Sequence, residues 1–334
     1  MELSIVIVNY NTKDYLFDCL QSLSSFKDNG IEAFVVDNAS TDGSPDMVAA
    51  DFPWVTLIRN EQNRGFAAAN NQAILRSIGR YIMLLNSDTI MLKGTLEKII
   101  SFMDQHPDIG IVGCKLLNTD GSLQPSITSF PNLIKDTLNI ALIGTVIKNT
   151  PVMRAWLSQI GKIIGISASR FDDHAITKEI DFPRGACLTI RRTAMDQIGL
   201  LDEGYFFADE ELDWCYRIKQ RDWKVYYYPE AAVIHHDHGS IKGIMGKAFV
   251  QIRKSGLHFY QKHYGQLRTM VMKFLISAIL LAKCFYISCS LPFNSSKRLE
   301  LLARREIYWA TIRLYYDRRF RELNVFSEMP FRYN

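Results

Sequence analysis

Hydrophobic residues in the first 240 positions follow two alternating patterns. Short runs rich in β-branched residues, of which LSIVIVNY (3–10) is the first, predict strands buried on both faces of a parallel sheet. Segments between them, such as DYLFDCLQSL (14–23), repeat apolar residues every three to four positions, which predicts helices. Further predicted strands are 31–40, 55–60, 81–88, 109–117, 187–192 and 224–236, and further predicted helices are 65–78, 94–106 and 207–220. This alternation predicts a three-layer α/β/α sandwich with a mostly parallel central sheet.

Two of the predicted strands end in polar residues. The strand at 31–40 runs into Asp37, and the strand YIMLLNSD at 81–88 ends in Asn86, Ser87 and Asp88. Ligands of such sheets bind beyond the carboxyl ends of the strands, so we expect the chemistry of this protein there. Asp37 is suited to accept hydrogen bonds from a base imide or a ribose hydroxyl, or else it closes an Asx-turn.

Asp88 is a candidate metal ligand. Mg²⁺ and Mn²⁺ commonly take one or two carboxylates and leave their other positions to phosphate oxygens. The alternative is that Asp88 is a turn residue or a cap for the helix predicted to begin at Gly94.

An acidic cluster, DEELDW, precedes the last predicted strand. A carboxylate there is a candidate general base, although acids also stabilise the first turn of a helix through its dipole. The cluster consists of Asp209, Glu210, Glu211 and Asp213.

A histidine cluster, HHDHGS, follows the last predicted strand and contains His235, His236 and His238. One of these imidazoles is a candidate metal ligand opposite an aspartate. A zinc site is disfavoured because no cysteine lies nearby with zinc-finger spacing.

Charge divides the chain near residue 240. Residues 1–240 hold 22 Lys and Arg against 30 Asp and Glu, whereas residues 241–334 hold 17 against 5. No acid occurs between positions 241 and 293. We therefore expect a domain at 1–240 and a basic, helical C-terminal region at 241–334. Within the first domain we also expect two halves, at 1–115 and 116–240.

The C-terminal region contains MVMKFLISAILLAKCFYISCSLPF (270–293), which approaches the length of a membrane-spanning helix. Lys273 and Lys283 interrupt it, and a lysine inside a membrane is costly. A helix that lies on an anionic membrane surface fits better, with a spanning helix and a buried helix as alternatives. Nucleic acid is not expected as a partner, because the basic residues alternate with a long aliphatic run.

Composition and motifs narrow the class of protein. Of the 334 residues, 48% are hydrophobic and 22% charged, as in a globular protein. The six cysteines form no CxxC pair, and the N-terminus lacks the pattern of a signal peptide, so we expect an intracellular chain with free thiols. The sequence has no G-x-G-x-x-G, P-loop or G-x-S-x-G motif, which disfavours Rossmann dinucleotide, Walker-type ATP and α/β-hydrolase sites.

Seven segments, taken in order, resemble the family 2 inverting glycosyltransferases, and in particular the rhamnosyltransferase-like enzymes that build O-antigen and other bacterial surface polysaccharides. The segments are SIVIVNYN, VVDNASTDGS, NRGFAAANN, LLNSDT, GACLTIRR, GLLDEGYFFADEELDWCYR and VIHHDHGS, and they cover about residues 3–240. The resemblance implies a GT-A fold, a UDP- or dTDP-sugar donor and Mg²⁺ or Mn²⁺. It also implies inverting transfer of rhamnose or another hexose to a hydroxyl of a saccharide acceptor.

The resemblance assigns donor-binding roles to residues around the strand ends. Asp37 matches the aspartate that contacts the base, and Asn86 replaces the first aspartate of the family's D-x-D motif. The donor-binding residues are Asn9, Tyr10, Asn11, Asp37, Asn63, Arg64, Gly65, Asn86, Ser87, Gly185 and Ala186.

The resemblance also assigns the metal and the base. Asp88 matches the metal-binding aspartate, and His235 lies near a histidine that is sometimes a further ligand, with His238 as the competing choice. Glu211 matches the catalytic aspartate, and Glu210 remains an alternative base.

The basic, apolar C-terminal region and the apolar stretch at 133–147 suggest a lipid-linked acceptor and a peripheral position on the cytoplasmic face of the inner membrane. Two rival interpretations are a nucleotidyltransferase and a catalytically inactive protein that binds sugar nucleotides or scaffolds a membrane complex. The first would typically need a Gly-rich, basic loop near the N-terminus, which IVNYNTKDY lacks.

Overall fold

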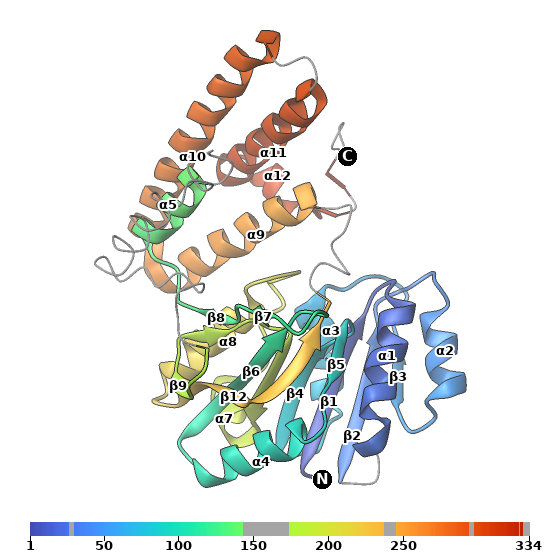
Figure 1. Cartoon of the computed structure of the whole chain (residues 1–334). Helices are drawn as coiled ribbons and strands as arrows, with labels where there is room; N and C mark the ends of the chain where they lie inside the picture. The colour runs from blue at the N-terminus through green and yellow to red at the C-terminus, as the bar shows by residue number, and fades with distance from the viewer. Residues whose placement is uncertain (27–29, 143–173, 237–244, 294–296, 327, 330–334) are drawn as a thin grey trace. The chain divides into compact units, whose positions relative to one another are not determined.

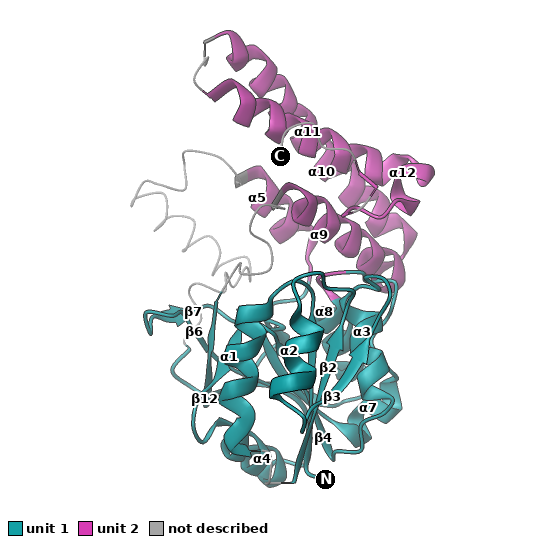
Figure 2. Cartoon of the chain, turned by 90° about the vertical axis from the view of Figure 1, so that its right-hand side faces the viewer, with its two compact units in different colours: residues 1–130, 167–206, 210–240 teal, residues 131–166, 207–209, 241–334 magenta. Residues whose placement is uncertain are grey.

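The computed structural model describes residues 1–26, 30–142, 174–236, 245–293, 297–326 and 328–329 (Figure 1). The chain divides into two compact units, which Figure 2 shows in separate colours. Unit 1 comprises residues 1–130, 167–206 and 210–240, and unit 2 comprises residues 131–166, 207–209 and 241–334.

Unit 1 is built on a mixed sheet with the strand order β3-β2-β1-β4-β11-β6-β12-β5. The strands β3, β2, β1 and β4 run parallel, β11 runs antiparallel between β4 and β6, and β12 is parallel to β6. Its strands are β1 (Leu3–Asn9), β2 (Ile31–Asp37), β3 (Thr56–Arg59), β4 (Tyr81–Asn86), β5 (Thr89–Met91), β6 (Ile109–Leu117), β11 (Cys187–Arg191) and β12 (Lys224–His235). The two-residue strands β7 (Leu123–Gln124) and β9 (Lys178–Glu179) pair with β6 and β12, and β8 (Ile127–Thr128) pairs with β10 (Phe182–Pro183).

Helices cover both faces of this sheet (Figures 1 and 2). On one face α1, α2 and α4 share a core with the side chains of Leu3, Ile5 and Ile7 of β1. The helices α3, α7 and α8 lie on the other face. The helices of unit 1 are α1 (Lys13–Leu23), the 3-10 turn at Ser24–Phe26, α2 (Ser44–Asp51), α3 (Phe66–Ile74), α4 (Thr95–Gln105), α7 (Arg192–Ile198) and α8 (Glu210–Lys219). The predicted three-layer α/β/α fold is confirmed.

Several short elements were not predicted from periodicity. They are α2, α7 and the strands β5, β7, β8, β9 and β10. Strands of two or three residues are too short to show an alternation, and α2 has a weak separation of apolar and polar faces.

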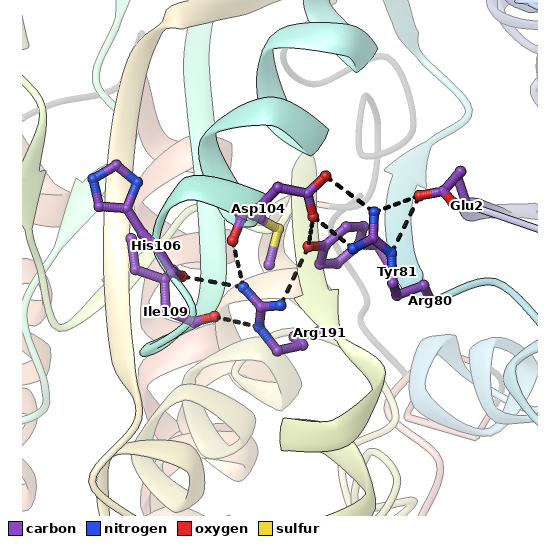
Figure 3. A network of polar contacts seen from close by, with 8 residues as sticks. Glu2, Arg80, Tyr81, Asp104, His106, Ile109 and Arg191 are labelled. Carbon is purple, nitrogen blue, oxygen red and sulfur yellow. Dashed lines mark hydrogen bonds and ion pairs between the residues drawn. The ribbon is translucent and has the colours of Figure 1, made fainter.

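A polar network fixes the end of the sheet opposite the predicted site (Figure 3). Arg80 pairs with Glu2 and Asp104 at 2.5 and 2.7 Å, and the hydroxyl of Tyr81 donates to Asp104 at 2.6 Å. Arg191 donates to that same hydroxyl at 3.2 Å and to backbone carbonyls beyond the end of α4. Arg191 belongs to the GACLTIRR segment, so this part of the motif has a structural role.

Unit 2 is helical. Its core contains Met272, Ile276 and Leu280 from α10 together with Leu314 and Tyr315 from α11. Its helices are α5 (Leu133–Leu142), α9 (Met245–Phe259), a π-helical turn (Tyr260–Tyr264), α10 (Gly265–Ser290), the 3-10 turn at Leu291–Phe293, α11 (Arg298–Tyr316) and α12 (Arg318–Glu322). Among the described residues, one helical stretch, Gly246–Ser290, is long and apolar enough to cross a membrane.

The helix α5 lies in unit 2, whereas the sequence placed it in a domain at 1–240. Ile140 of α5 packs into the core of unit 2, and Asp136 accepts a hydrogen bond of 2.7 Å from the hydroxyl of Tyr260. These contacts join segments far apart in the sequence. The part of the apolar stretch 133–147 that follows α5 lies outside the described residues.

All six cysteines are free thiols, five of them buried and Cys289 exposed.

Candidate active site

Three parallel strands of unit 1 end at the same level. In the pairing register Asn9 of β1 lies opposite Asp37 of β2, and Val8 of β1 lies opposite Asn86 of β4. The predicted donor-binding and metal-binding residues of these strands are therefore brought to one edge of the sheet, as expected for a parallel arrangement.

The carboxylate of Asp37 is held by two hydrogen bonds. It is 2% exposed, and it accepts from Nδ2 of Asn9 at 2.9 Å and from the backbone N–H of Ser40 at 3.0 Å. The other end of the Asn9 amide accepts from Oγ1 of Thr12 at 2.6 Å, and Thr12 Oγ1 lies 2.8 Å from Oγ of Ser87. A continuous chain of hydrogen bonds thus connects the ends of β2, β1 and β4.

The turn after β1 presents an aromatic ring to solvent. Asn11 has a left-handed backbone with φ of 54°, and its side-chain oxygen accepts from the N–H of Thr41 at 2.7 Å. Tyr10 precedes it and is 50% exposed. A fixed turn therefore displays the Tyr10 side chain next in sequence to the buried Asn9.

Asn38 connects the end of β2 to the loop at 63–65. Its Nδ2 donates to Asn63 Oδ1 at 3.1 Å and to the carbonyl of Gly65 at 3.2 Å, and its Oδ1 accepts from the N–H of Arg64 at 3.2 Å. The side chain of Arg64 is exposed. Gly65 has φ of +84°, and a Cβ on it would lie 2.6 Å from the carbonyl oxygen of Phe206, so only glycine fits there.

Asp88 and His235 face each other across a pair of strands. Asp88 lies in the turn between β4 and β5, and β5 pairs with β12 so that Thr89 is opposite His235. The Nε2 of His235 is 3.3 Å from Oδ1 of Asp88, and both residues are buried. The Nδ1 of His235 is 2.7 Å from Oε1 of Gln124. The competing ligand His238 lies outside the described residues.

Within the described part of the chain, no group of three or more His, Cys, Asp or Glu side chains is arranged to hold a metal. The protein side of a metal site at Asp88 would therefore consist of two ligands, and other groups would have to complete it.

Glu211 lies beside the Gly185–Ala186 pair at the start of β11. The N–H of Asn86 donates to the carbonyl of Ala186 at 3.0 Å, which joins this pair to the Asn86–Asp88 turn. A Cβ on Gly185 would lie 3.1 Å from Oε1 of Glu211, so the carboxylate rests against the glycine.

Burial raises the pKa of Glu211 above its ordinary value, and the backbone N–H groups of Glu211 and Gly185 and the charge of Arg184 offset this only in part. The Oε2 atom of Glu211 is buried and has no hydrogen-bond partner among the described residues. A carboxylate with a raised pKa that is not fully hydrogen-bonded is a suitable proton acceptor.

The other acids of α8 differ from Glu211. Asp213 is buried and pairs with Arg217 at 2.7 Å, and Arg217 also donates to the carbonyls of Ile198 and Leu200, so Asp213 has a structural role. Glu210 is buried at 5% exposure.

The comparisons with known proteins agree with this geometry. The sequence profile of glycosyl transferase family 2 matches residues 4–199, which is more than half of the chain. The chain is a family 2 glycosyltransferase. The expected family and the expected enzyme class are thereby confirmed.

The relatives of this glycosyltransferase include a rhamnosyltransferase and a teichoic acid biosynthesis protein. The chain is 24% identical to an N-acetylglucosaminyl-diphospho-decaprenol L-rhamnosyltransferase of Mycobacterium tuberculosis. The alignment extends over 315 residues and covers 91% of this chain and 98% of that protein. It is 27% identical over 126 residues to the minor teichoic acid biosynthesis protein GgaB of Bacillus subtilis, covering 36% of this chain and 14% of that protein.

Among solved structures, the fold is similar to that of the mannosyltransferase PcManGT from Pyrobaculum calidifontis, solved in complex with GDP-Man and Mn²⁺. The TM-score is 0.52 at 16% identity, over 94% of this chain and 84% of that one. This likeness confirms the GT-A fold.

Several residues that contact the predicted site were not identified from the sequence of the glycosyltransferase. They are Thr12, Asn38, Ser40 and Gln124. Asn38 and Ser40 lie inside the VVDNASTDGS segment, which offered a signal. Gln124 lies in none of the seven segments, and only the pairing of β7 with β6 brings it to His235.

Proposed function

We propose that this glycosyltransferase transfers rhamnose or another hexose, with inversion, from a UDP- or dTDP-sugar to a hydroxyl of a lipid-linked saccharide. The product would belong to O-antigen or another cell-surface polysaccharide. The observation that carries this proposal is the convergence of Asp37, the Asp88–His235 pair and Glu211 around adjoining strand ends within unit 1. The decaprenol-linked rhamnosyltransferase, similar over 91% of this chain, supports both the sugar and the acceptor class.

Asp37 and Tyr10 are suited to hold the base of the donor. Among the described residues, each carboxylate oxygen of Asp37 accepts one hydrogen bond, and a carboxylate oxygen can accept two. Asp37 therefore retains capacity for the imide N–H of uracil or thymine, or for a ribose hydroxyl. The exposed ring of Tyr10 offers a flat surface on which a base can stack.

Asp88 and His235 are suited to hold a divalent metal. Their facing atoms are 3.3 Å apart, and two adjacent ligands of an octahedral Mg²⁺ or Mn²⁺ are separated by about 3 Å. One carboxylate and one imidazole leave most of the coordination positions to diphosphate oxygens and water. When bound, the metal would neutralise charge on the leaving diphosphate.

Glu211 is the proposed general base, and Glu210 remains the alternative. The carboxylate of Glu211 takes the proton of the acceptor hydroxyl while the hydroxyl oxygen bonds to the anomeric carbon. The bond between that carbon and the diphosphate oxygen breaks, and the nucleoside diphosphate leaves with the bonding electrons. A single displacement inverts the configuration, so one base suffices. The raised pKa of Glu211 strengthens it as a proton acceptor.

The helix α10 is the proposed contact with an anionic membrane surface. One face of α10 packs inside unit 2, and the opposite face is apolar and exposed. The exposed side chains are Leu267, Met270, Val271, Phe274, Leu281, Phe285 and Tyr286.

The two lysines that interrupt the sequence of α10 point toward α11. The Nζ of Lys273 is 4.8 Å from the ring centroid of Tyr316, and that of Lys283 is 5.9 Å from the ring centroid of Tyr308. The exposed apolar face is thus not interrupted by them. Because residues 241–293 contain no acid, anionic lipid would meet no repulsion there, and the enzyme would be peripheral on the cytoplasmic face of the inner membrane.

The proposal is tested by release of nucleoside diphosphate from a panel of UDP-, dTDP- and GDP-sugars, with Mn²⁺ or Mg²⁺, with and without membrane lipid extract. We expect release from one UDP- or dTDP-sugar that is stimulated by lipid, lost in Asp88→Ala and reduced to a small but measurable rate in Glu211→Gln. Glu97→Gln is the matched control, because Glu97 is an exposed glutamate in the first turn of α4. Binding of no nucleotide sugar at all by the wild-type chain would refute the proposal.

A further inference from the structure

The turn between β6 and β7 forms a hydrogen-bond chain that ends at His235. Its members all lie in unit 1, and most of them are in the segment NTDGSLQ (118–124). Nothing in the transfer reaction described above requires this turn, yet it places a 3% exposed glutamine directly behind the imidazole.

The direction of every hydrogen bond in this series follows from its first member, the carboxylate of Asp120. Two hydrogen bonds from Ser122 lower the pKa of Asp120, so at neutral pH this carboxylate only accepts. The hydroxyl of Ser122 donates to Asp120 at 2.6 Å and must therefore accept from Nδ2 of Asn118, at 2.8 Å. This turns Oδ1 of Asn118 toward Gln124, whose Nε2 donates to it at 3.0 Å.

The carbonyl of His235 fixes the glutamine in the same orientation, because Nε2 of Gln124 lies 3.4 Å from that oxygen. The Oε1 atom of Gln124 then faces Nδ1 of His235 at 2.7 Å. A carbonyl-type oxygen accepts only, so Nδ1 must carry the hydrogen. In the neutral imidazole the lone pair is thereby left on Nε2, the atom that faces Oδ1 of Asp88 at 3.3 Å.

We propose that Gln124 is a positioning residue of the metal centre, which selects the Nδ1–H tautomer of His235 and directs its Nε2 lone pair to the ion held with Asp88. This inference rests on the proposed metal site. A ligand histidine commonly donates its second N–H to a neighbouring acceptor, and loss of such a partner typically weakens metal binding by about 10- to 100-fold.

The test compares Gln124→Met with Gln124→Glu in the full-length chain. Methionine preserves the length of the side chain and removes both hydrogen-bonding ends, whereas glutamate keeps the acceptor for Nδ1–H. Gln105→Met is the matched control, since Gln105 is an exposed glutamine of α4 that bonds only to Ser101 among the contacts described. Thermal melting of each variant shows whether the fold is retained.

Two readouts are needed. The first is the dissociation constant of Mn²⁺, measured by electron paramagnetic resonance in the presence of UDP. The second needs no metal and is the tautomer of His235, read from the ¹⁵N spectrum of histidine-labelled protein and assigned by the signal lost in His235→Gln.

We expect Gln124→Met to weaken Mn²⁺ binding about 10- to 100-fold and to shift His235 away from the Nδ1–H tautomer. Gln124→Glu keeps the acceptor for Nδ1–H but loses the donor to Asn118 and to the carbonyl of His235, so it should retain the Nδ1–H tautomer and bind Mn²⁺ more tightly than Gln124→Met. Gln105→Met should match wild type. Wild-type affinity and tautomer in Gln124→Met would overturn this inference alone. Absence of Mn²⁺ binding by the wild-type chain would overturn the metal site and this inference together, while sugar-nucleotide binding would still test the proposed function separately.

Discussion

Replacing Gly185 by alanine tests whether Glu211 acts as the base, because the two residues touch. A Cβ on Gly185 would lie 3.1 Å from Oε1 and 3.2 Å from Cδ of Glu211. The backbone of Gly185 does not have a positive φ, so alanine meets no conformational strain there. The added methyl group therefore acts mainly by moving the carboxylate.

The size of this displacement follows from van der Waals distances. Non-bonded heavy atoms in ordinary contact are at least about 3.5 Å apart, so the carboxylate must move by roughly 0.4 Å. Misplacing a catalytic group by about 1 Å can reduce the rate roughly 100-fold, or about 2.7 kcal/mol. In proportion, a shift of about 0.4 Å corresponds to roughly 1 kcal/mol, or about a fivefold fall in kcat.

The assay is kcat for nucleoside-diphosphate release at saturating donor, measured for Gly185→Ala in the wild-type and Glu211→Gln backgrounds. If the methyl group acts through Glu211, the fall should appear in the first background and be absent from the second. Gly256→Ala is the control, because the nearest atom to a Cβ on Gly256 is 4.0 Å away. An unchanged kcat, or equal falls in both backgrounds, would refute the role of Glu211 as the group displaced.

Three further predictions concern the base, the donor loop and the membrane. Burial raises the pKa of Glu211 above 4.5, so the folded protein accommodates the protonated carboxyl better than the carboxylate. The contribution of this group to the free energy of unfolding is therefore complete below pH 4.5 and is lost as the pH rises through the raised pKa. Glu211→Gln should therefore melt higher than wild type at pH 8 and like wild type near pH 4, and equal melting at both would contradict this. Gly65→Ala should lower the free energy of unfolding by about 2–5 kcal/mol in urea titrations, through its positive φ and the clash with Phe206. Phe274→Asp should reduce flotation with anionic vesicles at least about tenfold, whereas Ile78→Asp, which also replaces an exposed apolar side chain, should not.

The sequence alone determined the three layers of unit 1. It also determined that the candidate site residues lie at the carboxyl ends of the parallel strands. Parallel strands buried on both faces read as continuous apolar runs, so β1, β2 and β4 were visible without a structure. Because such strands share a direction, their polar ends had to meet at one edge, and Asp37 and Asp88 followed from that rule. The composition likewise showed that residues 241–293 are basic and contain no acid.

What the tertiary structure decided is which polar groups touch and which atoms they present. No periodicity shows that Asn38 bonds the loop at 63–65, that Glu211 rests on Gly185, or that Gln124 lies behind His235. These contacts join segments separated by up to 111 positions through a sheet whose order differs from the order of the sequence. Local pattern specifies elements because it reflects which face of each element is buried. Contacts between distant elements depend on register and packing, which are set only when the whole sheet is assembled.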